Sequence, residues 1–237
     1  MQISKEQFLE NNEKLKQELS ALNRKEAGVF IDGAFDPSNY YDSELKLLWI
    51  LKEPYGDPFD YPDFFIKKFD QFFKDLICGV PKHTWGTIAK ISDNIFNDYS
   101  LELRSKDIST RKSAIQLSLS KIAFININKD SSDTGGRSLT RNVADAKVYY
   151  DEFLFKQIKH LSPDVIICGN TFQFLKDKYA NPAVIKNIAG EDYVDHYHID
   201  NILFVDPYHP GYLAYGKIDD LAYINDIVRT VKHCIKW

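Results

Sequence analysis

Four short apolar segments divide the chain at wide intervals. Each is bounded by turn residues or charged side chains, and each is short enough for a strand that is buried on both faces. When helices separate such strands, the connections cross over and the sheet is parallel, with helices on both of its faces. The four segments are Leu45–Leu51, Ile122–Ile127, Val165–Cys168 and Ile202–Val205.

Apolar residues at helical spacing occupy most of the chain between these segments. Ser4 and Gln7 have the spacing of a capping box, so we predict an amphipathic helix over residues 4–23. We therefore expect an α/β protein with three layers, α/β/α, around a central four-stranded parallel sheet. The other predicted helices are Phe64–Ile77, Thr87–Phe96, Leu139–His160, Phe172–Tyr179, Ala183–Ile188 and Asp219–Ile235.

Length and composition narrow the class of protein. A chain of 237 residues favours a single domain over residues 1–237, with a helical extension over about residues 1–30. No apolar run approaches the roughly 20 residues of a membrane span, and the polar N-terminus is unlike a signal peptide. The cysteines Cys78, Cys168 and Cys234 are scattered, which favours free thiols and a cytoplasmic protein. The formal net charge of −4 argues against coating nucleic acid through charge alone.

Polar side chains follow three of the four apolar segments, where ligands of open parallel sheets bind. The first segment runs into ILKEPYG, which places Glu53 directly after it. The second runs into AFININ, which holds Asn126 and Asn128, and the fourth is followed by DPYHPGYL, which holds His209 between two prolines. We therefore expect a carboxylate, an amide and an imidazole at one end of the sheet.

Two further patterns carry weaker signals. The stretch SSDTGGRS opens a predicted helix near Ser138, where backbone N–H groups could hold a phosphate beside Arg137 and Arg141; a flexible polar loop is the alternative. His196 and His198 would share one face of a strand, as metal ligands do, but no carboxylate or cysteine lies at a recognised ligand spacing. We expect a plain edge strand there and no metal.

The strand ends resemble the motifs of the uracil-DNA glycosylase superfamily. ILKEPYG resembles its GQDPYH motif, AFININ its LLLNxVL strand and HPGYL its HPSPL motif, in order and spacing over about residues 44–215. The resemblance implies a uracil-DNA glycosylase-like fold and a hydrolase of base-excision DNA repair. Such an enzyme flips a uracil-like or damaged base out of DNA and cleaves its N-glycosidic bond. It implies no cofactor, since three scattered cysteines cannot supply the four ligands of the iron–sulfur cluster found in some members.

The resemblance also implies roles for individual residues. Glu53 would orient water and stabilise the sugar cation, and His209 would donate a hydrogen bond to the departing base. Asn126 would bind the edge of the base, which an amide can do as both donor and acceptor. Around them, Tyr55 would wall the pocket, Phe64 or Phe65 would stack on the base, Lys52 would replace a family Gln, and Leu213 would fill the gap left by the flipped nucleotide.

Besides Lys52 in place of Gln, two departures from the family motifs keep other functions open. Glu53 stands where the family has Asp, and a displacement of about 1 Å can cost about 100-fold in rate. Gly211 and Tyr212 replace Ser-Pro, which removes a hydroxyl that contacts DNA phosphate. The alternatives are a non-catalytic nucleic-acid-binding or interaction protein on the same fold, and a hydrolase of a small nucleoside-like ligand. A basic strip would favour DNA; its candidates are Lys52, Lys129, Arg137 and Arg141.

Overall fold

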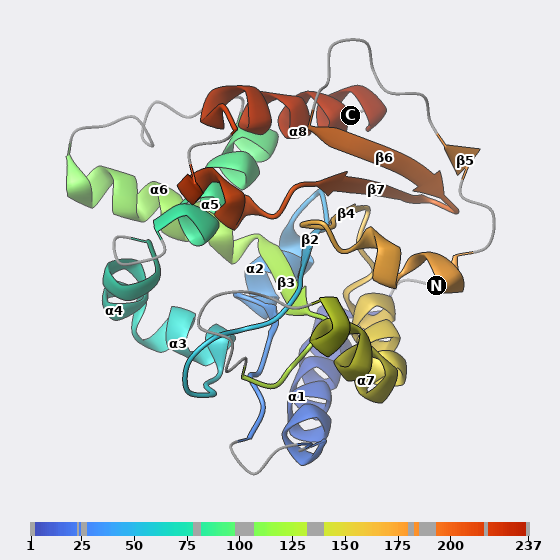
Figure 1. Ribbon diagram of the computed structural model, residues 1–237. Coiled ribbons are helices and arrows are strands. Elements are labelled where there is room, and N and C mark those ends of the chain that lie inside the picture. Colours follow the sequence, from blue (N-terminus) through green and yellow to red (C-terminus); the bar gives the residue numbers. More distant parts are fainter. Residues whose placement is uncertain are drawn as a thin grey trace.

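A mixed sheet runs through the centre of the molecule. The computed structural model describes residues 3–22, 24, 28–77, 82–97, 107–131, 140–179, 183–184, 193–215 and 218–235. Within these ranges, seven strands pair in the order β1-β3-β2-β4-β7-β6-β5 (Figure 1). Their bounds are Gly33–Ala34 (β1), Leu47–Leu51 (β2), Ile122–Asn126 (β3), Val165–Ile167 (β4), Ala183–Val184 (β5), Val194–Ile199 (β6) and Ile202–Pro207 (β7).

The four apolar segments form the parallel centre of this sheet, which confirms them as strands. β2 lies between β3 and β4, with Leu47 in register with Ile122 and Val165, and β7 follows β4. The predicted extent of the sheet is wrong, because antiparallel strands extend both of its edges: β1 beside β3, and β6 and β5 beside β7. The segment with His196 and His198 is β6, and it is not an edge strand, since β5 pairs with its outer side.

The helices agree with the prediction where an apolar stripe is clear. α1 (Lys5–Ala21) begins with the expected capping box between Ser4 and Gln7. The predicted helix over 64–77 is divided, because Lys68 has non-helical backbone angles, and the segment 172–179 forms two short 3-10 turns. The other helices are α2 (Pro37–Asp42), α3 (Tyr61–Lys67), α4 (Phe69–Phe72), the π-helix η1 (Phe73–Ile77), α5 (Lys82–Asn97), α6 (Ile108–Ser120), α7 (Thr140–Leu161) and α8 (Asp220–Cys234).

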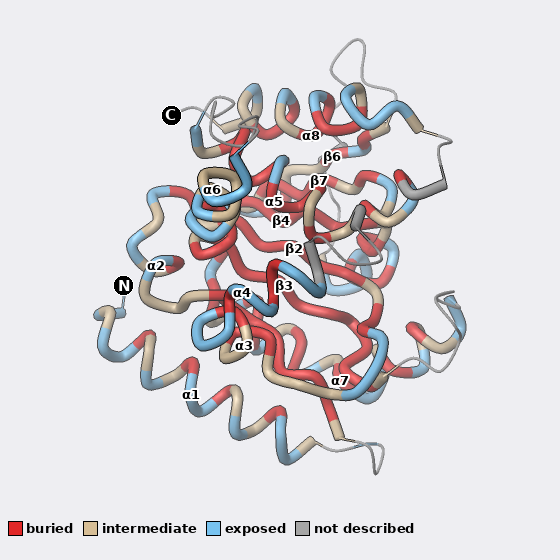
Figure 2. Tube along the Cα trace, turned by 90° about the vertical axis from the view of Figure 1, so that its left-hand side faces the viewer, coloured by how far each residue is buried: buried red, intermediate tan, exposed pale blue. Residues whose placement is uncertain are grey.

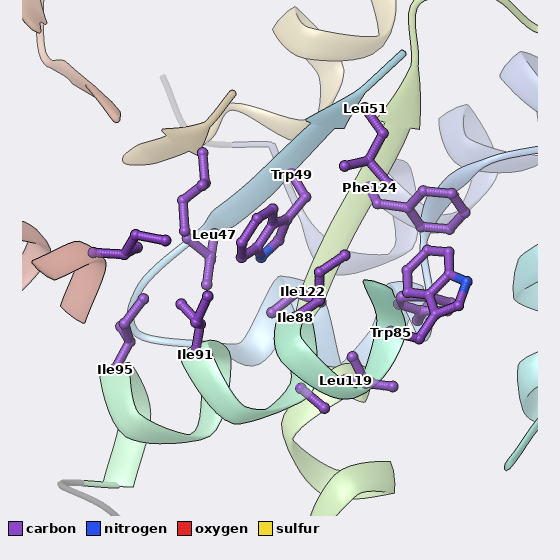
Figure 3. Close-up of a cluster of buried hydrophobic side chains, with 14 of the residues drawn as sticks. Leu47, Trp49, Leu51, Trp85, Ile88, Ile91, Ile95, Leu119, Ile122 and Phe124 are labelled. Atoms are coloured by element: carbon purple, nitrogen blue, oxygen red, sulfur yellow. The ribbon is translucent and has the colours of Figure 1, made fainter. Parts of the chain in front are cut away.

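Helices cover both faces of the sheet, and the central strands are buried throughout (Figure 2). Alternation along β2 sends Leu47, Trp49 and Leu51 to one face, where α5 and α8 pack, and Leu48 and Ile50 to the other, where α7 packs. On the first face, the apolar side chains of α5 point toward β2 and β3 (Figure 3). α1 packs on α7 through a smaller cluster of apolar residues, so it belongs to the same folded unit.

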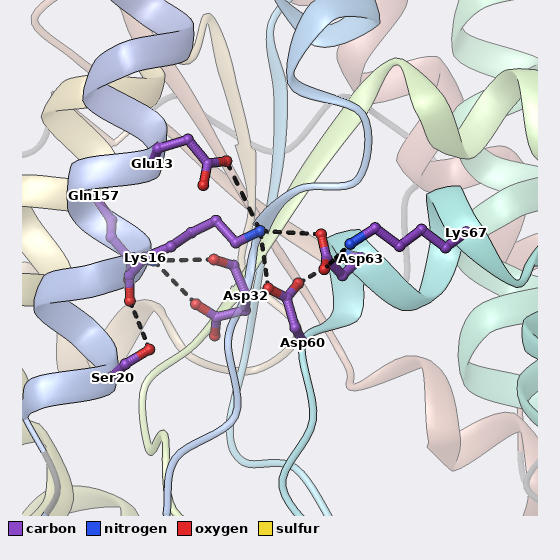
Figure 4. Close-up of polar contacts among 8 residues, drawn as sticks. All are labelled: Glu13, Lys16, Ser20, Asp32, Asp60, Asp63, Lys67 and Gln157. Carbon is purple, nitrogen blue, oxygen red and sulfur yellow. Dashed lines mark hydrogen bonds and ion pairs between the residues drawn. The ribbon is translucent and has the colours of Figure 1, made fainter.

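A buried ion pair fixes the β1 edge of the sheet. The Nζ atom of Lys129 lies 2.8 and 2.9 Å from the two carboxylate oxygens of Asp32, and both side chains are 0% exposed. Asp32 also accepts a hydrogen bond from Nε2 of Gln157 at 3.0 Å (Figure 4). Close by, Lys16 of α1 lies 2.8 Å from a carboxylate oxygen of Asp60. Lys129 therefore offers no charge to a surface, and the predicted basic strip loses this member.

Candidate active site

The candidate site lies at the carboxyl ends of the parallel strands. Asn126 is the register partner of Leu51, and the pairing continues past both strands, where the N–H of Asn128 donates to the carbonyl of Lys52 at 2.9 Å. Asn126, the last residue of β3, follows Phe124 by two residues and so continues the sheet face that α5 and α8 cover, whereas Glu53 lies two residues beyond the end of β2. The structure thus brings the ends of β2 and β3 together, and with them Glu53 and Asn126.

Glu53 is a buried carboxylate, and only one of its two oxygens has a hydrogen-bond partner among the described residues. Its side chain is 8% exposed, and Oε2 accepts a hydrogen bond from Nδ2 of Asn128 at 3.3 Å. Oε1 is buried and has no hydrogen-bond partner among the residues that the structure describes. A buried polar atom without a partner costs free energy, and a water or ligand that completes the site is one physical reason for such an atom.

His209 is held in a defined tautomer by the loop that follows β7. The backbone N–H of Gly211 donates to Nδ1 of His209 at 3.0 Å, so Nδ1 is the acceptor and the proton of the neutral ring is on Nε2. Burial, together with the smaller effect of the nearby ammonium of Lys52, lowers the pKa of His209 to about 4. At neutral pH, His209 is therefore an uncharged donor through Nε2–H.

Two glycines make room for this imidazole. A Cβ atom on Gly169, directly after β4, would lie 3.3 Å from atoms of Leu51 and Pro210 and 3.6 Å from the ring of His209. A Cβ atom on Gly211 would lie 3.1 Å from Nδ1 of the same ring. Gly169 thus lies close both to Leu51 at the end of β2 and to the loop after β7 that holds His209.

Asn126 is positioned through its backbone. It is 3% exposed, and its N–H donates to Oδ2 of Asp32 at 2.7 Å. The buried pair of Asp32 and Lys129 therefore fixes the end of β3 from outside the site. Sequence reasoning missed this support, because nothing in the sequence connects two residues that are 97 positions apart.

A second carboxylate, Asp206, closes the opposite face of the sheet at the same end. It accepts hydrogen bonds from the backbone N–H groups of Thr171 at 3.2 Å and Phe172 at 3.4 Å. The pKa of Asp206 is raised to about 7, because burial outweighs these two hydrogen bonds, which lower it. Asp195, its register partner on β6, adds a smaller increase, and Lys52 a smaller decrease, within that value. Burial also lowers the pKa of Lys52. Sequence reasoning read Asp206 only as part of a turn.

Relative to wild type, the Asp206→Asn variant is expected to gain more stability at pH 8 than at pH 5. The folded state holds the Asp206 proton up to about pH 7, whereas an unfolded Asp releases it near pH 4, so wild-type stability from this group falls as the pH rises through that window. The amide of the variant does not titrate and keeps an acceptor oxygen. Urea denaturation at both pH values measures the difference, with the exposed Asp177→Asn as control. An equal change at pH 5 and pH 8 would contradict the assigned pKa.

Of the aromatic and apolar residues that the sequence predicts for the site, some lie at the surface and others in the core. Tyr55 is 42% exposed. Phe65 is 2% exposed and packs against Phe35 and Phe72, so it has almost no surface to offer a base. Phe64 lines a hollow of about 540 Å³ on α3, whose described lining includes neither Glu53 nor His209. Leu213 is 4% exposed and belongs to the core, which corrects its assignment to DNA.

Two tyrosines near His209 are exposed, in contrast to the buried Leu213. Tyr208 and Tyr212 flank His209 in the chain, are 49% and 44% exposed, and have ring centroids 6.2 Å apart. Of the predicted phosphate contacts, Arg141 is exposed on α7, whereas Arg137 and Ser138 lie outside the described residues.

Comparison with known proteins assigns no family. No protein-family model matches the chain, and no curated protein matches it either. Within the described ranges, no group of three or more His, Cys, Asp or Glu side chains is arranged to hold a metal ion. In the same part of the chain, no helix combines the length and apolarity needed to cross a membrane.

Proposed function

We propose that this protein hydrolyses the N-glycosidic bond of a base flipped out of DNA, on a uracil-DNA glycosylase-like fold. The observation that carries the proposal is the presence of two groups beyond the carboxyl ends of the parallel strands β2 and β7. His209 is a neutral Nε2–H donor, and Glu53 is a carboxylate with a buried, uncommitted oxygen. Support also comes from the order of the motifs, which follow the first, second and fourth parallel strands along the chain, as the resemblance implies.

In the proposed reaction, the bond between the sugar C1′ and the base nitrogen breaks and its electron pair leaves with the base. Nε2–H of His209 stabilises the negative charge that develops on a base oxygen. Oε1 of Glu53 orients a water and accepts its proton as the water oxygen bonds to C1′, while the carboxylate charge stabilises the sugar cation. Asn126 binds the edge of the base through its amide. The base anion takes up a proton from solvent and Glu53 returns its proton to solvent, so the products are a free base and an abasic sugar.

Glu53→Gln is expected to lower base release by about 100-fold, because the amide neither accepts the proton nor stabilises the cation. Release is measured from single- and double-stranded DNA that contains uracil, hypoxanthine, xanthine or alkylated bases. The matched control is Glu44→Gln, which alters an exposed residue before β2 and should keep the wild-type rate. If folded wild type releases no base from any of these substrates, the proposed reaction is wrong and the alternatives without DNA cleavage take its place.

A small nucleoside-like ligand is the second candidate substrate. The burial of Lys129 favours it, because the predicted basic strip beside the site loses a cation and the chain is acidic overall. The two candidates differ in their need for an extended surface. DNA would use Tyr208 and Tyr212 as stacking platforms, whereas a free nucleoside would occupy only the site itself.

Replacing Tyr208 and Tyr212 together with Ala is therefore expected to weaken binding of single-stranded DNA about tenfold or more, since base–aromatic stacking contributes about 1–3 kcal/mol per base. Fluorescence anisotropy with a labelled oligonucleotide at several salt concentrations measures the effect. Tyr149→Ala on α7 is the control, because that residue has a similar exposure of 48%. Unchanged DNA affinity, together with unchanged release from free nucleosides, would favour the small-ligand candidate.

A further inference from the structure

The contact between Asn128 and Glu53 is the only hydrogen bond to the Glu53 side chain among the described residues. Nδ2 of Asn128 lies 3.3 Å from Oε2 of Glu53, at the long end of the hydrogen-bond range. Asn128 is 3% exposed and Glu53 8%, so water does not compete with this contact. Hydrogen bonds in unliganded active sites are often long and shorten when the substrate binds.

The orientation of the Asn128 amide is fixed on its other side. Its Oδ1 accepts a hydrogen bond from the backbone N–H of Asp130 at 3.0 Å, which an amide nitrogen could not do. Asp130 is itself fully buried, and its carboxylate accepts hydrogen bonds of 2.6 Å from the hydroxyl of Tyr150 and from Nε of Arg24. The amide therefore presents Nδ2 to Glu53 and cannot turn over without leaving a buried donor unpaired.

We propose that Asn128 is a positioning residue, which holds Oε2 of Glu53 so that Oε1 remains directed at the substrate. The proposal deepens the proposed function and rests on it for the identity of the reaction. It also explains why position 53 carries Glu. A shorter Asp side chain would withdraw the carboxylate from Asn128, whereas Glu reaches it. The pair, and not residue 53 alone, sets where the carboxylate lies.

The contact between Asn128 and Glu53 can be tested without an assay of base release. In ¹⁵N NMR spectra, the side-chain amide signal of Asn128, assigned by its loss in Asn128→Ala, should shift in Glu53→Gln, which keeps the size of residue 53 and removes its charge. It should not shift in the control Glu44→Gln. Equal signals in wild type and Glu53→Gln would overturn the proposal. Glu53→Gln and Glu44→Gln both keep Asn128, so the comparison does not require Asn128→Ala to fold. If Asn128→Ala is unstable, triple-resonance spectra assign the signal instead.

The positioning role is tested by exchanging one methylene between the two side chains. Glu53→Asp is expected to lower kcat about 100-fold with little change in KM, because the carboxylate is displaced by about 1 Å. Adding Asn128→Gln lengthens the amide by the same methylene and should recover tenfold or more of that loss, although Asn128→Gln alone lowers kcat. A double variant no faster than Glu53→Asp would overturn the positioning role. If wild type releases no base while the NMR shift is present, the proposed reaction fails and the orientation of Glu53 by Asn128 stands.

Discussion

Replacing Lys129 with Met is expected to lower the free energy of unfolding by about 3–5 kcal/mol, the usual cost of breaking a buried ion pair by removing one partner. The substitution keeps most of the side-chain volume and leaves the carboxylate of Asp32 in the interior without its cation. Asp32 retains two donors, Nε2 of Gln157 and the N–H of Asn126, and these cannot neutralise a full charge. Urea denaturation at pH 7 measures the loss.

The matched control is Lys67→Met. Lys67 pairs with Asp63, and its side chain is 68% exposed, so its removal should change stability by no more than about 1 kcal/mol. A second variant tests the cause. Removing both charges, in Lys129→Met with Asp32→Asn, should recover part of the loss, because no unpaired charge remains in the interior. A Lys129→Met protein as stable as wild type would contradict the burial of this pair.

The same network connects stability to the candidate site. Asp32 holds the backbone of Asn126, and Lys129 follows Asn128 in the chain, so damage to the pair should disturb the end of β3 as well as the fold. This connection distinguishes Lys129→Met from a change at the surface. It should impair ligand binding at temperatures where the protein is still folded.

The central strands could be predicted from the sequence, because a strand buried on both faces is a continuous apolar run. The edge strands could not. β1 and β5 have two residues each, too few to show any periodicity, whereas the segment with His196 and His198 was expected to be a strand and is β6. α6 has no apolar stripe, since its buried residues are confined to its last turn at Ser118–Ser120, and so no helical spacing marked it.

The candidate site was partly predictable for a related reason. The residues after parallel strands must meet at one edge of the sheet, which placed Glu53 and Asn126 at the neighbouring carboxyl ends of β2 and β3. What the sequence could not supply is which neighbours are buried. Leu213 follows a surface turn and folds inward, whereas Lys129, a charged residue, finds a partner from a distant segment. Burial of this kind depends on tertiary contacts that no local pattern records.

Replacing His209 with Ala is expected to lower the rate of base release by about 10²–10³-fold, the usual loss on removal of one donor to a developing oxyanion. The loss should appear in kcat, because the donor acts on a charge that exists only in the transition state. The exposed His233 on α8 provides the control, since His233→Ala removes an imidazole far along the chain from the site. An unchanged rate for His209→Ala would show that the imidazole has no role in the reaction.

The pH dependence gives an independent check on the same residue. Because the pKa of His209 is lowered to about 4, the neutral ring persists well below pH 6.5, and its ionisation should not limit wild-type base release between pH 5 and 8. An unfolded histidine gains its proton near pH 6.5, so the stability contributed by the neutral ring is complete above that pH and is lost as the pH falls toward 4. His209→Ala should remove this part of the acid sensitivity. If instead wild-type activity fell with an apparent pKa near 6.5 that disappeared in His209→Ala, the ring would be exposed to solvent and the fixed Nε2–H donor would be wrong.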